Sequence, residues 1–73
     1  MAWTTLQTND KIDITYDSQG DPVTAKFTIN NVEYTVTDPD LLGLAELAEA
    51  AHDRGDPVEV DIVNGEIVDI RLP

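Results

Sequence analysis

Residues 23–36 read Val-Thr-Ala-Lys-Phe-Thr-Ile-Asn-Asn-Val-Glu-Tyr-Thr-Val, two alternating segments separated by Asn30-Asn31. A period of two between apolar and polar residues is typical of half-buried strands. Asparagine tolerates the positive φ that a two-residue hairpin turn requires. With this turn, three apolar cross-strand pairs fall on one face: Ile29 with Val32, Phe27 with Tyr34, and Ala25 with Val36.

The same alternation extends toward the N-terminus, and a change of period follows toward the C-terminus. Residues 11–16 alternate like a strand, and residues 17–22, Asp-Ser-Gln-Gly-Asp-Pro, form a turn. Beyond the hairpin, Asp38 and Pro39 are an N-cap and a first helical residue, and Gly55 ends a helix. We therefore predict a helix over residues 39–53. Its buried arc at 100° per residue consists of Leu41, Leu44, Ala45, Leu47, Ala48 and Ala51.

The last hairpin joins residues 58–63 to residues 66–72 across Asn64-Gly65. A two-residue turn mixes buried and solvated positions, since it places Val60 opposite Asp69. A three-residue loop with a glycine bulge restores an apolar face by pairing Val60 with Val68. We therefore predict the three-residue loop.

These elements predict a small α+β domain of five antiparallel strands, with one helix between strands 3 and 4. The order resembles that of the OB-fold, a five-stranded barrel with a helix at the same place in the chain. An open sheet with the helix on one face fits the pattern equally well. We expect one domain over residues 1–73, with a core over 11–72 and a short N-terminal extension over 1–10, and the pattern leaves open an extended piece at 3–6.

The charge is strongly one-sided. Fifteen Asp and Glu against four Lys and Arg give a net charge of −11, while 41% hydrophobic residues suit a globular chain. A surface of this sign repels phosphates and anionic lipids, which argues against direct binding of nucleic acid or membranes. No apolar run spans a bilayer and no signal peptide begins the chain, so a cytoplasmic protein is expected.

The residues needed for chemistry are scarce. The chain has no cysteine, one serine (Ser18) and one histidine (His52), which is expected to contact the last carbonyls of its own helix. The turn at residues 17–21 lacks the alternating ligands of a calcium loop. We expect no enzymatic activity, no cofactor and no metal site.

The acidic residues are instead placed as though for a partner. Glu46, Glu49 and Asp53 share the outer helix face, where like charges repel. On the last hairpin, an exposed pair, Val63 and Ile67, is rimmed by acids, as in a protein-binding patch. Leu42, on the predicted solvent side of the helix beside Glu46 and Glu49, is a second candidate apolar anchor. The predicted partner-binding residues are Glu46, Glu49, Asp53, Glu59, Asp61, Glu66, Asp69, Leu42, Val63 and Ile67.

In size and charge the chain resembles the phage-encoded DNA-mimic inhibitors, such as anti-restriction and anti-CRISPR proteins. The resemblance implies a small acidic interaction protein that occupies a basic, nucleic-acid-binding surface of a larger protein and blocks it. The alternative is an OB-like binding domain from a salt-loving cell, in which the acidity is an adaptation of solvation and implies no partner. Ten Asp against five Glu, with two Lys and two Arg, are compatible with this alternative.

Overall fold

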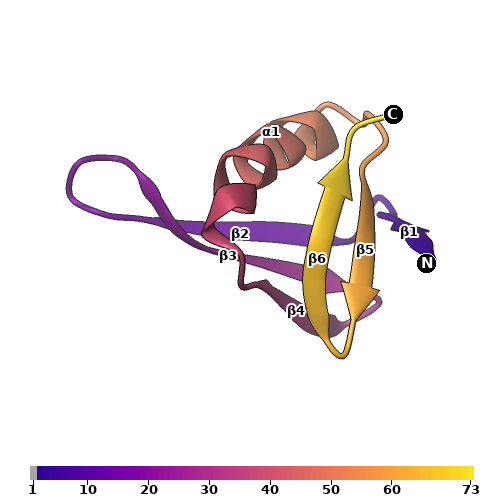
Figure 1. Ribbon diagram of the computed structural model, residues 1–73. Coiled ribbons are helices and arrows are strands. Elements are labelled where there is room, and N and C mark those ends of the chain that lie inside the picture. The colour runs from indigo at the N-terminus through magenta and orange to yellow at the C-terminus, as the bar shows by residue number, and fades with distance from the viewer. Residues whose placement is uncertain (1) are drawn as a thin grey trace.

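The computed structural model describes residues 2–73 and contains one six-stranded sheet and one helix (Figure 1). A single turn of 3₁₀-helix, η1 (Pro39–Leu41), leads into the helix α1 (Leu42–Asp53). The strands are β1 (Trp3–Thr5), β2 (Lys11–Tyr16), β3 (Pro22–Ile29), β4 (Val32–Val36), β5 (Glu59–Val63) and β6 (Glu66–Arg71). Their order across the sheet is β1-β5-β6-β4-β3-β2.

The prediction of five antiparallel strands with the helix between strands 3 and 4 is wrong. The sheet is mixed, because β4 and β6 pair in parallel through Thr35 with Glu66 and Val36 with Ile67. The additional strand, β1, has only three residues, too few for an alternating pattern, and it pairs with β5. The helix consequently follows the fourth strand. Because β1 and β2 lie at opposite ends of the strand order, the sheet does not close into an OB-type barrel.

The β3–β4 hairpin confirms the predicted register. Ile29 pairs with Val32, Phe27 with Tyr34 and Ala25 with Val36. Asn30 and Asn31 both have positive φ, at 52° and 67°, as a type I′ turn requires. The preferred turn of Asn30-Asn31 and the apolar face of the two strands require the same register, so each of them independently favours it.

The predicted limits of the helix are also confirmed. An Asp38 Oδ1 atom accepts a hydrogen bond from the Asp40 amide at 2.9 Å, and Pro39 is the first residue of the 3₁₀ turn. At the other end Gly55 has a φ of +83°. Its amide donates to the His52 carbonyl at 3.0 Å, and the Asp56 amide donates to that of Ala51 at 2.9 Å. This pair of bonds is a Schellman motif.

The three-residue loop predicted for the last hairpin is wrong. Val63 pairs with Glu66, so the turn is the two-residue Asn64-Gly65, and both its residues have positive φ. The irregularity lies further along the ladder, where Ile62 faces Ile67 but Asp61 faces Asp69. Val68 is therefore the extra residue of a bulge within β6. The sequence predicts a bulge in this hairpin, but the structure places it inside the strand.

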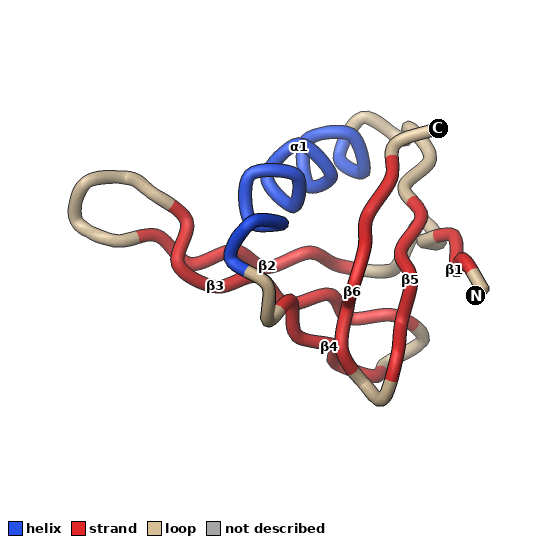
Figure 2. The backbone as a smooth tube through the Cα atoms, viewed as in Figure 1, coloured by secondary structure: helices blue, strands red, loops and turns tan. Residues whose placement is uncertain are grey.

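The core lies between α1 and one face of the sheet. Phe27, Val58, Val60 and Ile67 are its largest fully buried side chains. Figure 2 shows α1 lying across the strands, while the 17–21 turn carries the end of the β2–β3 hairpin away from the body. From α1 the buried residues are Leu42, Ala45, Ala48 and Ala51. Leu47, predicted to be inward, is 60% exposed, so the packed face of the helix is rotated relative to the predicted one.

Candidate functional site: an acidic flank beside the sheet edge

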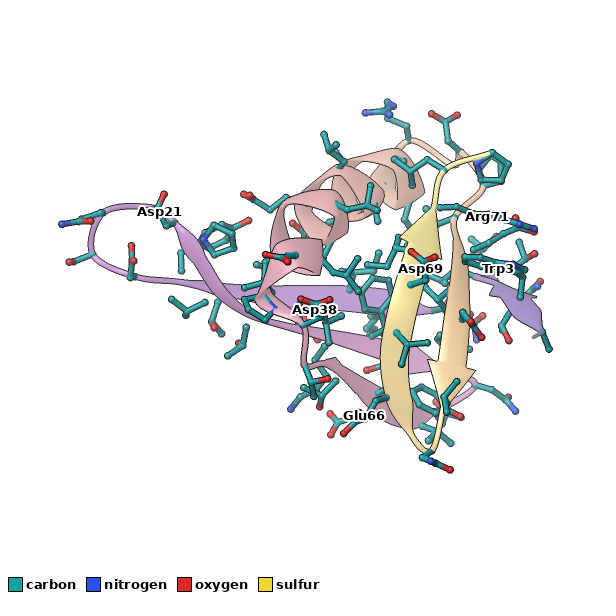
Figure 3. All side chains as sticks on the ribbon, viewed as in Figure 1. Trp3, Asp21, Asp38, Glu66, Asp69 and Arg71 are labelled. Atoms are coloured by element: carbon teal, nitrogen blue, oxygen red, sulfur yellow. The ribbon has the colours of Figure 1, made fainter. Side chains whose placement is uncertain are left out.

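The predicted partner-binding residues come from three elements, α1, β5 and β6. Glu46, Glu49 and Asp53 lie on α1. The other acids lie on β5 and β6. Across these two strands Asp61 pairs with Asp69, and Glu59 pairs with Arg71. Figure 3 shows Arg71 and Asp69 toward one end of β6 and Glu66 near the other end.

Two of the three predicted apolar anchors are not exposed. Ile67 is fully buried at 0% exposure, because the strand bulge turns it inward and leaves Val68 exposed instead. Leu42 is 9% exposed and belongs to the core, because the rotation of α1 brings it against the sheet. Val63 alone has the expected exposure, at 47%. The predicted apolar patch of Val63 and Ile67 is therefore absent.

The β5–β6 acids are partly neutralised or buried. Arg71 Nε donates to Glu59 Oε1 at 2.5 Å, and its guanidinium carbon lies 4.1 Å from the centroid of the Trp3 ring (Figure 3). The hydrogen bond from Arg71 lowers the pKa of Glu59. Asp61, between Trp3 and Asp69 in the ladders, is only 3% exposed. This face consequently presents less free negative charge than the sequence indicates.

The helix acids, in contrast, are joined by further residues from β2. Burial raises the pKa of Glu49, and the negative charges of Asp53, Asp13 and Glu46 raise it further. We call Asp13, Glu46, Glu49 and Asp53 the acidic flank. Its charges come from two elements, and mutual repulsion makes the group favourable for an incoming cation.

Tyr16 extends the acidic flank along β2. Tyr16 is 46% exposed. Partial burial raises the pKa of Tyr16, and the negative charges of Glu46 and Glu49 and a hydrogen bond with Glu46 act in the same direction. Sequence reasoning missed Tyr16 and Asp13 as parts of the site, because only the packing of α1 beside β2 brings them to the helix acids. No local motif signals that contact.

Other polar side chains make hydrogen bonds that stabilise the fold. Asp10 is buried and accepts hydrogen bonds from the amides of Gln7 at 2.7 Å and Asn30 at 3.1 Å. His52 Nε2 lies 2.6 Å from the Asp10 carbonyl, so it donates there and not to its own helix, contrary to expectation. In the 17–21 turn, Asp17 Oδ1 accepts from the amides of Gln19 and Asp21. These bonds join the loops to the sheet and helix.

Residues 2–73 enclose no pocket, and no three of their His, Cys, Asp and Glu side chains are grouped to hold a metal ion. None of its helical segments has the length and apolar character needed to cross a membrane. No protein-family model, curated protein or solved structure matches the chain. The acidic flank is therefore the candidate site that the geometry itself offers.

Proposed function

We propose that this chain is a non-enzymatic interaction protein that binds a basic, nucleic-acid-binding surface of a larger protein and blocks it. The acidic flank is the observation that supports this proposal most directly. Burial raises the pKa of Glu49, and the negative charges of three other carboxylates, Asp53, Asp13 and Glu46, raise it further. Such crowding disfavours the isolated chain, and a Lys- or Arg-rich partner relieves it.

The density of charge supports the same proposal. The longest dimension of the molecule is 33 Å, and the net charge is −11. A DNA duplex of that length carries about 19 phosphate charges, at one per ~1.7 Å. The two values are within a factor of two. A groove that attracts a duplex would therefore attract this molecule, as the DNA-mimic inhibitors do with their targets, and association would be fast and sensitive to salt.

Capture followed by competition with DNA tests the proposal. The immobilised protein is incubated with lysate, and the captured proteins are then challenged with duplex DNA. We expect nucleic-acid-binding proteins to be captured and then released by the DNA. Capture that duplex DNA leaves unchanged would contradict the proposal.

Two charge-reversal variants locate the surface responsible. Glu49→Lys with Asp53→Lys alters the acidic flank, whereas Glu66→Lys with Asp69→Lys alters β6. Each pair changes the net charge by +4, from −11 to −7. Long-range attraction is therefore weakened about equally, and only local contacts differ. We expect the first pair to abolish capture and the second to reduce it partially. The reverse order would move the binding surface to β6.

The salt-adaptation alternative has an observation in its favour. The acids are spread over every part of the chain, from Asp10 to Asp69, and three of the four Lys and Arg side chains are already in ion pairs with Glu33, Asp56 and Glu59. This alternative requires concentrated salt for folding, whereas the interaction proposal does not.

A further inference from the structure

The outer edge of β2 has no neighbouring strand in the sheet. The β3–β4 hairpin determines which of its backbone groups face outward. In a two-residue hairpin the pair beside the turn, here Ile29 and Val32, exchanges hydrogen bonds, and bonded and non-bonded pairs then alternate. Thr28, Lys26 and Thr24 consequently direct their N–H and C=O groups toward β2.

The partners of those three residues in β2 are Lys11, Asp13 and Thr15. These three use their backbone groups within the sheet, so Ile12 and Ile14 direct theirs to the free edge. Ile12 is buried, close to the point where His52 contacts the Asp10 carbonyl. Ile14 is only partly buried, and its neighbours Asp13 and Thr15 are exposed. The accessible part of the edge therefore centres on Ile14.

The acidic flank runs along this same edge. The helix α1 packs against β2, and His52 in its last turn contacts the carbonyl of Asp10, just before the start of the strand. Figure 1 shows the helix and the strand running in opposite directions. The helix thus lies antiparallel beside β2. Its acids lie next to the stretch of strand where the backbone N–H and C=O groups of Ile14 point toward the edge of the sheet.

We infer that β2 accepts an extended, Lys- or Arg-rich segment of the partner as an added seventh strand. This inference rests on the proposed function and specifies how the acidic flank is used. The Ile14 N–H and C=O groups bond the added strand and fix its register. Cationic side chains at every second position of that strand share one face of the sheet, where they contact Glu46 and Glu49.

The charge of the edge selects a basic segment over a second copy of this chain. Open edges invite pairing between identical strands, and native proteins commonly prevent it with charged side chains. Here a second copy also has a net charge of −11 and would bring its own acidic flank against this one. A basic segment meets no such repulsion, so the same acids that oppose self-association favour it.

Amide hydrogen exchange, measured by NMR on the full chain, tests the inference. The probe is the blocked peptide acetyl-Arg-Val-Lys-Val-Arg-Val-Lys-amide at about 1 mM, well above the chain's concentration, since weak binding by mass action is sufficient. We expect exchange of the Ile14 amide to slow about tenfold. The Asp13 and Thr15 amides, already bonded to β3, should change little.

Other patterns of exchange overturn the inference in distinguishable ways. Peptide binding at Glu46 and Glu49 without protection of Ile14 would mean contact through side chains alone, and the proposed function would stand. Protection that grows with protein concentration in the absence of peptide would identify a second copy as the added strand. Absence of peptide binding would reject the added strand, whereas the proposed function fails only if DNA does not compete for the captured proteins.

The variant Ile14→Pro provides an independent test. Proline removes the outward N–H of Ile14 but no bond to β3, and proline is tolerated on the free side of edge strands. We expect peptide affinity to fall about fivefold or more, as loss of one hydrogen bond predicts. The control Thr15→Val keeps every backbone donor and should bind normally. Equal affinity of a folded Ile14→Pro variant would overturn the inference.

Discussion

The carboxylates of Glu49 and Glu59 have pKa values shifted in opposite directions, so they change the stability of the fold in opposite ways as pH changes. Burial and the charges of Asp53, Asp13 and Glu46 raise the pKa of Glu49 above 4.5, so the folded chain holds this proton more tightly than the unfolded chain. The contribution of Glu49 to stability is therefore lost as pH rises from about 4.5 through the raised pKa. The Arg71 hydrogen bond lowers the pKa of Glu59, whose contribution is present above pH 4.5 and is lost as pH falls through the lowered value.

Substitution of each carboxylate by its amide tests these signs. We expect Glu49→Gln to raise the free energy of unfolding at pH 7 by a few tenths of a kcal/mol, the size of a like-charge helix pair. The gain should disappear at about pH 4 and below, where the wild-type carboxyl is protonated. Glu59→Gln is the matched control and should destabilise at pH 7 but not at low pH. Urea unfolding across this range measures both, and a Glu49→Gln loss at pH 7 would contradict the assigned repulsion.

Among the elements, the two hairpins show what the sequence predicts and what it does not. At Asn30-Asn31 the preferred turn and the apolar alternation require the same register, and that prediction is confirmed. At Asn64-Gly65 the preferred turn and the apolar alternation require different registers. The structure keeps the favoured two-residue turn and corrects the alternation with a bulge at Val68. The turn signal is therefore the stronger one, because its positive φ values suit Asn-Gly at little cost.

The helix illustrates a second limit. The caps Asp38 and Gly55 fix where it starts and stops, since their hydrogen bonds are local. Its rotation is decided by packing on the sheet, and leucines occur on both sides of the wheel. Leu42 is buried and Leu47 exposed, opposite to the prediction. The parallel pairing of β4 with β6 depends on the same long-range packing. So does the position of the helix acids next to Asp13 of β2.

Two glycine substitutions test the local conformations of helix and hairpin. In α1 a Cβ added at Gly43 meets nothing within 4 Å. We expect Gly43→Ala to stabilise the fold by about 0.5–1 kcal/mol, because alanine restricts the unfolded chain and favours helix. Gly65 also has open space but a φ of +80°, so Gly65→Ala should destabilise by about 1 kcal/mol or more. Denaturant unfolding measures both. Stabilisation by Gly65→Ala would contradict the type I′ turn.

Taken over the entire surface, charge determines how folding responds to salt. Three of the four Lys and Arg side chains are in surface ion pairs, and each pair stabilises the fold only slightly. The net charge of −11 therefore leaves a general repulsion among the acidic side chains. Screening shortens the reach of this repulsion from about 30 Å at 0.01 M salt to about 3 Å at 1 M. Salt should therefore stabilise the fold, but the buried core should already hold it together in dilute buffer.

We expect cooperative urea unfolding at 25 °C in 0.01 M buffer, with a midpoint that rises moderately up to 1 M KCl. The Glu66→Lys, Asp69→Lys variant has a smaller net charge and should show a weaker dependence on salt, which makes it the control for general repulsion. A chain that folds only above about 1 M KCl would instead support the salt-adaptation alternative. In that case the acids would serve solvation, and the acidic flank would need no basic partner to explain it.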